Sequence, residues 1–464
     1  MNILLRNICS LLFRIIVRNR CHSKLAFFYS LIIKELTSDG KIKRPSKQAG
    51  NNKLTILVLS IDGFRSDVDC IANTNEFRVL IIPVQWQRRL VYQFYPVELQ
   101  KYGFKNNPDQ LGYKYSKEQE EIREFLYEFL ARLYKRISIN CVISPHSRYV
   151  ADLDWGAVST KLGVPHILIP RDSQFASSPY LLNRMKHFFS DGLPKFEGKH
   201  IIVQSELDRE VYIDTGYVDV EKTSSLGCPR MDGFLRKSKE KRLDAKRRRK
   251  KVVFLPFTYK EKGTFDILDL RSYVKELQLF FLRFAIKFPE IDVVIKPKPK
   301  GLKPWEKEVM FEMIGDAGTE NNKLLNLIIR NDIDIHSLFR ESDVVCGLNT
   351  SALLEAAVIG LPIIIPYFKD LQCPKYDERL FYRDAYNLFD IAEDTIELES
   401  LILYRLENPI IEEKIMEGRK ALFGKYVSSV KGDATEKHVT LIKEIVNKKE
   451  DSIFFKSTPK QANW

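Results

Sequence analysis

The chain has 464 residues, of which 44% are hydrophobic and 11% aromatic, and its formal net charge is +13. This composition excludes a disordered protein and a small disulfide-stapled scaffold, and the length predicts two to three domains, two by default. The seven cysteines include no CxxC pair, which argues against a disulfide framework or a zinc ribbon and favours a reducing cytosol.

The excess positive charge is concentrated in two segments. Residues 1–53 and 235–251 each hold 11 Lys or Arg against 2 acidic residues, which leaves 52 basic and 57 acidic groups, a net charge of −5, in the rest. A nucleic-acid-binding protein is expected to place its positive charge on a folded face or recognition element. This distribution therefore argues against a nucleic-acid partner.

Residues 3–18 have the pattern of a basic amphipathic helix. Apolar residues recur there at helical spacing, while Arg6, Ser10, Arg14 and Arg18 follow one another at intervals of four. The uncharged runs are too short for a transmembrane helix, and the arginines interrupt any signal-peptide core. Two interpretations stay open: the helix lies in the interface of an anionic membrane, or its apolar stripe packs on the protein's own core.

After this N-terminal segment, short β-branched runs alternate with helical stretches. Such alternation predicts a parallel sheet covered on both faces, which forms a first Rossmann-like domain over residues 54–233. A basic linker over 234–250 follows. The predicted strands are 54–61, 77–84, 139–144, 164–169 and 200–204, with helices at 116–136 and 151–162.

A second alternating pattern over residues 251–430 predicts another doubly wound α/β domain. Residues 431–464 form a last helix, expected to pack back across the first domain, and a tail. Two such domains would leave a cleft facing the carboxyl ends of both sheets, where open α/β sheets bind ligands. The predicted strands are 252–257, 291–296, 325–329, 343–346 and 362–366, and the predicted helices are 267–288, 305–314, 335–340 and 350–359.

The most informative stretch is 343–366, where a buried strand leads through a polar loop into an apolar helix. Asn349, Thr350 and Ser351 stand at the helix N-terminus, where free N–H groups and the helix dipole favour a phosphate. Glu355, one turn into the helix, could reach a ribose hydroxyl. The alternative is that the three loop residues only cap the helix.

This stretch resembles the donor-binding strand, loop and helix of GT-B glycosyltransferases, especially bacterial enzymes of capsule, lipopolysaccharide and teichoic-acid assembly. Three further segments resemble motifs of the same enzymes, in the same order, so that the resemblance covers roughly residues 140–445. These segments are the G-x-P-R-x-D-like run 226–232, the basic strand end 295–299 and the polar turn 432–435.

The resemblance implies a GT-B-like fold and a glycosyltransferase, for which the cysteines favour the cytoplasm and the basic N-terminal helix favours the inner face of a membrane. Such an enzyme would use a nucleotide-activated sugar, with CMP-Kdo as one donor consistent with the resemblance, to build a surface polysaccharide or a lipid-linked glycan. Helix N-termini and basic side chains would stabilise the departing phosphate without an obligatory metal or other cofactor. Lys296 and Lys298 would join the loop at the donor, and a solvated loop is the alternative for both lysines.

The acceptor side is expected from the first domain, where polar residues follow three strands. His146 and Asp172 are candidates for a general base on an acceptor hydroxyl, and Asp172 could instead be the nucleophile of a retaining double displacement. Asp62 and Arg65, after the first strand, are further cleft candidates. A cap or an ion pair is the alternative role for His146 and Asp172.

Two D-x-D matches, Asp152-Leu-Asp154 and Asp332-Ile-Asp334, resemble the metal-binding motif of the other large glycosyltransferase fold. Matches this short arise by chance, and Asp334 is better explained as the N-cap of the next helix, so we predict no metal site. His166 lies within an apolar strand and is predicted to be a satisfied core histidine.

Other functions stay open on the same fold. Within the enzymes, they are a CDP-glycerol-type polyol-phosphate transferase and a nucleotide-sugar 2-epimerase. An epimerase would be expected to show a stronger set of catalytic carboxylates and histidines and to need no membrane helix. From another class, the chain could be a non-catalytic, membrane-associated interaction protein that retains the fold.

Overall fold

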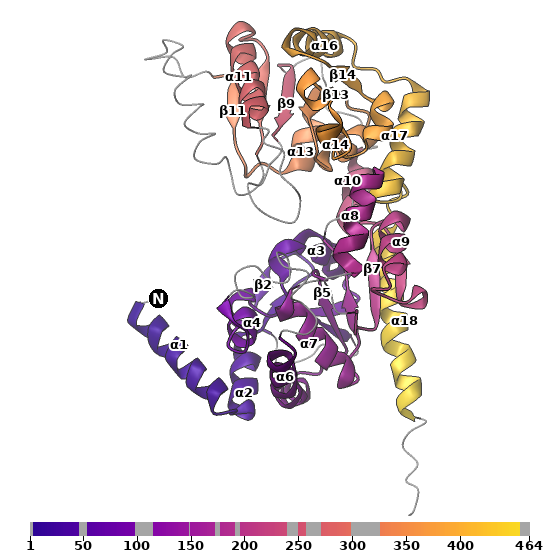
Figure 1. Cartoon of the computed structure of the whole chain (residues 1–464). Helices are drawn as coiled ribbons and strands as arrows, with labels where there is room; N and C mark the ends of the chain where they lie inside the picture. Colours follow the sequence, from indigo (N-terminus) through magenta and orange to yellow (C-terminus); the bar gives the residue numbers. More distant parts are fainter. Residues whose placement is uncertain are drawn as a thin grey trace, which may run out of the picture. The chain divides into compact units, whose positions relative to one another are not determined.

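The structure is a computed structural model that describes residues 3–45, 53–97, 115–147, 149–171, 177–190, 195–238, 249–256, 271–297 and 325–454. The chain forms two compact units. Unit 1 comprises residues 1–173, 186–232 and 432–464, and unit 2 comprises 174–185 and 233–431. Each unit is built on its own mainly or wholly parallel sheet with helices, which confirms the predicted α/β class with two Rossmann-like domains (Figure 1).

Unit 1 contains an eight-stranded sheet in the order β2-β1-β4-β3-β5-β6-β7-β8. From β4 to β8 all neighbouring strands are parallel. Because β4 lies on one side of β3 and β5 on the other, a topological switch point falls between β3 and β5. The strands are β1 (Lys34–Leu36), β2 (Ile42–Lys43), β3 (Leu54–Val58), β4 (Phe77–Ile81), β5 (Cys141–Ser144), β6 (His166–Leu168), β7 (His200–Val203) and β8 (Thr223–Ser225).

Helices cover both faces of this sheet, because alternate strand residues point to opposite sides. Leu57 and Leu59 enter one core with α2, α4, α6 and α7, whereas Ile56 and Val58 enter the other with α3 and α18. The last helix therefore packs on the first domain, as predicted. The helices and 3-10 turns of unit 1 are α1 (Ile3–Arg18), α2 (His22–Ile32), η1 (Ile61–Gly63), α3 (Arg65–Asn73), α4 (Val84–Val91), α6 (Ser116–Arg136), α7 (Val150–Lys161), α9 (Glu206–Asp214), η4 (Val220–Lys222) and α18 (Ala434–Phe454).

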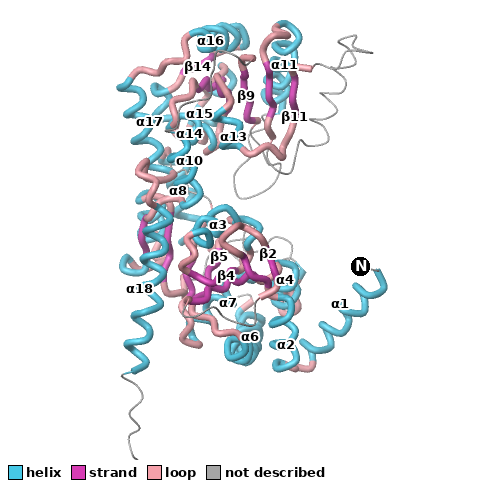
Figure 2. Tube along the Cα trace, turned by 180° about the vertical axis from the view of Figure 1, so that it is seen from behind, coloured by secondary structure: helices cyan, strands magenta, loops and turns pink. Residues whose placement is uncertain are grey.

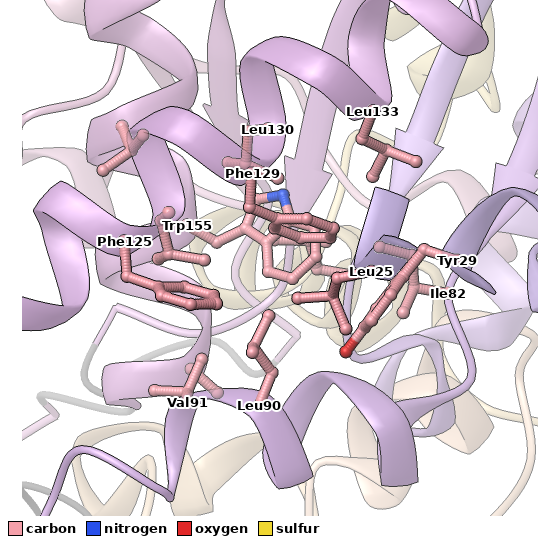
Figure 3. Close-up of a cluster of buried hydrophobic side chains, with 14 of the residues drawn as sticks. Leu25, Tyr29, Ile82, Leu90, Val91, Phe125, Phe129, Leu130, Leu133 and Trp155 are labelled. Carbon is pink, nitrogen blue, oxygen red and sulfur yellow. The ribbon is translucent and has the colours of Figure 1, made fainter. Parts of the chain in front are cut away.

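Aromatic side chains fill the core under α2, α6 and α7 (Figure 3). Tyr29 is fully buried, with its ring 4.9 Å from that of Phe129, and its hydroxyl donates a hydrogen bond of 2.8 Å to the carbonyl oxygen of Trp86. Phe129 in turn meets Trp155 edge to face. Residues before 53 thus form part of the core of unit 1.

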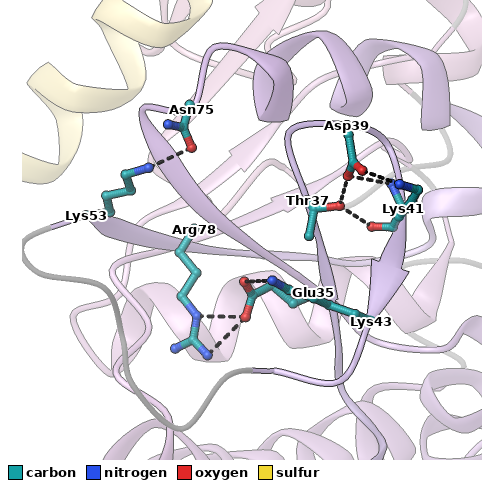
Figure 4. Close-up of polar contacts among 8 residues, drawn as sticks. All are labelled: Glu35, Thr37, Asp39, Lys41, Lys43, Lys53, Asn75 and Arg78. Carbon is teal, nitrogen blue, oxygen red and sulfur yellow. Dashed lines mark hydrogen bonds and ion pairs between the residues drawn. The ribbon is translucent and has the colours of Figure 1, made fainter.

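The strands β1 and β2 were not predicted, because neither contains an apolar run. β1 pairs antiparallel with β4, with Leu36 opposite Val79, and occupies an edge that β4 would otherwise expose. Arg78 and Glu35 form an ion pair of 3.3 Å across this pairing (Figure 4). Among the described residues, no helix is both long and apolar enough to cross a bilayer.

Unit 2 contains a six-stranded, wholly parallel sheet in the order β11-β10-β9-β12-β13-β14, with its switch point between β9 and β12. The strands are β9 (Lys251–Leu255), β10 (Asp292–Ile295), β11 (Leu327–Ile329), β12 (Val344–Gly347), β13 (Ile363–Pro366) and β14 (Asp390–Ala392). Its helices and 3-10 turns are α11 (Arg271–Lys287), α13 (Ile335–Arg340), α14 (Ala352–Val358), η5 (Lys369–Leu371), α15 (Pro374–Asp377), η6 (Arg383–Leu388), α16 (Thr395–Glu407) and α17 (Glu413–Tyr426). Two of the unit boundaries fall within helices, one in α8 (Pro179–Ser190) and one in α10 (Pro229–Ser238). Figure 2 labels both helices. The predicted helix at 305–314 lies outside the described residues.

Candidate active site

His146 follows β5, at the switch point of the unit 1 sheet, and is oriented by a buried carboxylate. Its Nδ1 lies 2.6 Å from Oδ2 of Asp152, in the first turn of α7. An ionised carboxylate only accepts hydrogen bonds, so Nδ1 carries the proton and Nε2 of the neutral ring keeps its lone pair. No described residue hydrogen-bonds to this Nε2. In the described part of the chain, Nε2 therefore has no partner and can accept a proton from a substrate.

Two further buried side chains hold the other oxygen of Asp152. The Ser60 hydroxyl donates to Oδ1 at 2.7 Å, and the Gln87 amide donates to the same oxygen at 2.6 Å. Ser60 follows β3 in a left-handed conformation (φ 47°), and Gln87 lies on α4, which follows β4. The network thus gathers residues from the carboxyl ends of three adjacent strands, where open α/β sheets bind ligands.

His146 was predicted from the sequence, whereas these partners were not. Asp152 was noted only as half of a D-x-D match, yet the two halves of that match have separate roles. Asp154 accepts hydrogen bonds from the Tyr95 hydroxyl at 2.6 Å and from Arg123 at 2.8 Å, and burial raises its pKa. Two carboxylates in an otherwise apolar helix were the signal that pointed to buried polar partners.

The other unit 1 candidates are placed differently. Asp62 is exposed on the turn η1, directly after β3. Arg65 pairs with Asp69 at 2.6 Å and donates to the carbonyl oxygen of Gly40 at 2.8 Å. Asp172 lies outside the described residues.

In unit 2, the loop between β12 and α14 is held by a neighbouring segment. Asn349 has a left-handed backbone (φ 50°), and its Oδ1 accepts a hydrogen bond of 2.9 Å from the Phe381 N–H. The Tyr382 hydroxyl donates to the Thr350 carbonyl oxygen at 2.7 Å. Ser351 makes no side-chain cap on α14, a helix of seven residues. Among the described contacts, neither the Asn349 nor the Ser351 side chain therefore caps α14.

Glu355, which was predicted to bind the nucleotide-sugar donor, follows this loop on α14. Glu355 is buried, and its carboxylate lies 2.9 Å from Nε2 of His336, whose ring stacks on Phe234 at 4.2 Å. A ribose reaching Glu355 would have to share the carboxylate with His336.

Lys296 is half-buried at the carboxyl end of β10. Burial lowers its pKa, while Asp334 and Asp332 oppose that shift. Asp334 caps α13 by accepting a hydrogen bond of 2.8 Å from the Ser337 N–H, as predicted. Lys298 lies outside the described residues.

Two segments that resembled family motifs meet within unit 1. Arg230 forms an ion pair of 2.8 Å with the buried Asp67. The Asp232 carboxylate accepts hydrogen bonds from the N–H groups of Ala434 at 3.2 Å and Thr435 at 2.7 Å, which caps α18. These motif residues therefore hold the last helix, α18, against the rest of unit 1.

No family model and no curated protein matches the chain. A solved UDP-GlcNAc 2-epimerase from Neisseria meningitidis, bound to UDP-GlcNAc, is similar at a TM-score of 0.49 and 14% identity, covering 86% of this chain and 100% of that one. A UDP-N-acetylglucosamine 2-epimerase from Rickettsia bellii has a TM-score of 0.45 and 10% identity, covering 87% and 100%. An α,α-trehalose 6-phosphate synthase from Burkholderia multivorans has a TM-score of 0.45 and 11% identity, covering 88% of this chain and 99% of that one. Likeness at this level decides neither activity nor substrate.

Proposed function

We propose that the protein is an enzyme of nucleotide-activated sugars that transfers a sugar to a hydroxyl of a surface polysaccharide or a lipid-linked glycan. The observation that supports this most directly is the His146–Asp152 pair, a base at a switch point whose Nε2 hydrogen-bonds to no described residue. The predicted donor loop, residues 349–351, occupies the equivalent position in unit 2, after β12.

In the proposed transfer, the acceptor oxygen forms a bond to the anomeric carbon as the bond from that carbon to the nucleotide phosphate breaks. Nε2 of His146 takes the proton of the acceptor hydroxyl, and Asp152 stabilises the imidazolium that results. Within unit 2, the N–H groups of the 349–351 loop, Lys296 and Lys298 are proposed to bind the nucleotide phosphate, and the proposal assigns this role to no metal.

The second candidate is 2-epimerisation of a nucleotide sugar, because the same base could take a proton from C2 of the sugar instead of from an acceptor. That activity is named for the Neisseria meningitidis structure. It needs no acceptor, so the two candidates differ in whether a nucleotide sugar alone gives a product.

The proposal also places the protein in the cytoplasm, at the inner face of a membrane. A lipid-linked acceptor is held in the bilayer, and the positive charge of residues 1–53 suits an anionic surface.

Nucleotide binding provides the first test. We expect one of CMP, CDP, UDP or GDP to raise the melting temperature of the full chain, since a ligand at 100 times its Kd stabilises by about 2.7 kcal/mol. Chelation by EDTA should leave the shift unchanged. Ser351→Asp should abolish the shift by placing a carboxylate beside the phosphate, whereas Ser351→Ala should retain it. No stabilisation by any of the four nucleotides would refute the proposal.

Turnover separates the candidate activities. The stabilising nucleotide, supplied as its sugar derivatives, should yield free nucleotide only with an acceptor if the chain is a transferase. A 2-epimer formed without acceptor would instead establish the second candidate. Nucleotide binding with no turnover of any sugar derivative would identify a non-catalytic protein.

A further inference from the structure

Over residues 11–18, whose side chains are described, the amphipathic helix α1 packs on unit 1 along one edge. Phe13 and Val17 are 4% and 3% exposed and belong to the core that includes α2. The Phe13 ring lies 5.1 Å from that of Trp86 in an edge-on contact. Packing on the protein's own core, one of the two interpretations left open above, thus accounts for part of the apolar surface of α1.

Three other apolar side chains in the described part of α1 are exposed to solvent. Leu11, Leu12 and Ile15 are 60%, 53% and 45% exposed. At 100° per residue these three side chains lie within an arc of about 100°, and Phe13 and Val17 point away from it. We call Leu11, Leu12 and Ile15 the exposed stripe.

Positive charge borders the exposed stripe. Arg14 and Arg18 are exposed, stand one helical turn apart and form no ion pair with any described residue. The sequence of α1 contains no acidic residue. An apolar stripe with unpaired arginines along its edge matches an anionic lipid surface, where acyl chains take the apolar side chains and headgroups take the charges.

We propose that α1 is a membrane-contact surface that lies in the interface of an anionic bilayer. The exposed stripe enters the acyl boundary, Arg14 and Arg18 contact lipid phosphates, and Phe13 and Val17 keep the helix attached to unit 1. A second copy of the chain is a poorer occupant, because pairing two such helices would bring arginines of like charge together. This proposal names the residues that would hold the protein at the membrane, as proposed above. It does not depend on which nucleotide the protein binds.

Co-sedimentation of the full chain with vesicles tests the proposal. Wild type should pellet with phosphatidylcholine vesicles that contain phosphatidylglycerol, pellet less with phosphatidylcholine alone, and be released by salt. The triple variant Leu11→Gln, Leu12→Gln, Ile15→Gln should lose at least about tenfold in partitioning. Arg14→Glu with Arg18→Glu should lose more than about twentyfold, since each arginine contributes about fivefold and each glutamate repels the surface.

A matched control changes exposed apolar residues that lack neighbouring unpaired arginines. Ile396 and Ile410 in unit 2 are 78% and 86% exposed, and Ile396→Gln with Ile410→Gln should pellet like wild type. Nucleotide thermal shifts should be the same in all variants, so this proposal can fail or hold separately from the proposed function. Equal pelleting of wild type and the triple variant would overturn it. A wild-type dimer that the triple variant turns into a monomer, without vesicle binding, would also overturn it in favour of a second copy.

Discussion

At the scale of single residues, the site depends on how one carboxylate divides its hydrogen bonds. Asp152 holds His146 with one oxygen and receives Ser60 and Gln87 on the other. A buried carboxylate with these partners is costly to disturb, because removal of one partner leaves a desolvated charge. His146 would be the catalytic residue, and Asp152 would position it.

Substitution of His146 separates catalysis from binding. His146→Gln should lower turnover by about 10²- to 10⁴-fold, the usual contribution of a general base, and leave nucleotide affinity unchanged. Asp152→Asn should lower turnover in the same direction, because an amide no longer enforces a protonated Nδ1. His187→Gln, on the exposed surface of α8, is the control. Steady-state kinetics with thermal melts would check this, and full activity of His146→Gln would exclude it as the base.

At the scale of elements, α7 lies very close to β6 because a glycine faces a histidine. His166 is buried, and its Nε2 lies 2.8 Å from the Ser144 hydroxyl, so it is the core histidine that the sequence predicted. A Cβ on Gly156 would lie 2.2 Å from Nδ1 of His166, a distance that real contacts do not reach. The close approach of α7 positions Asp152 beside His146.

Replacement by alanine is expected to have opposite effects at two helical glycines, one that faces His166 and one that faces open space. Gly156→Ala should destabilise unit 1 by about 1–3 kcal/mol or more, since the His166 ring must move within a packed core. Gly424→Ala, on α17, meets open space and should be neutral or stabilising by up to about 1 kcal/mol through helix propensity. Urea unfolding of both variants would test this, and equal effects would contradict the packing argument.

At the scale of the whole molecule, buried histidines are concentrated in unit 1. Burial lowers the pKa of His166 and of His200 to about 4 and also lowers that of His438. In the unfolded chain each titrates near 6.5, so below that pH the unfolded chain binds more protons than the folded one. Asp154, whose pKa is raised, opposes this trend with one carboxyl against three histidines.

Unit 1 should therefore lose stability as the pH falls from 6.5 towards 4, and its full stability should be present above 6.5. His166 alone would account for about 3 kcal/mol of this loss. Unit 2 holds one of the seven histidines, His336, and should respond less. Calorimetry across this range, with His200→Gln to flatten the slope, would measure the effect. A transition of unit 1 that is independent of pH would contradict it.

The sequence was sufficient for features that depend on local pattern. The helix Ser116–Arg136 was predicted with its observed bounds, because 21 residues carry a continuous helical periodicity. The parallel sheets followed from strands separated by helices, and Asp334 followed from the N-cap rule. For the helix and the N-cap, neighbouring residues contain the whole physical cause.

Other features required contacts between residues far apart in the chain. The three residues of β1 have no strand pattern and pair because β4 offers an edge. Asp152 became part of a site only because Ser60 and Gln87 arrive from other strand ends, and α1 was divided into buried and exposed edges only by α2 and Trp86. Hydrophobic periodicity predicts which residues are buried. Which residues they pack against, and which surfaces stay exposed, depend on the order of the strands in the sheet.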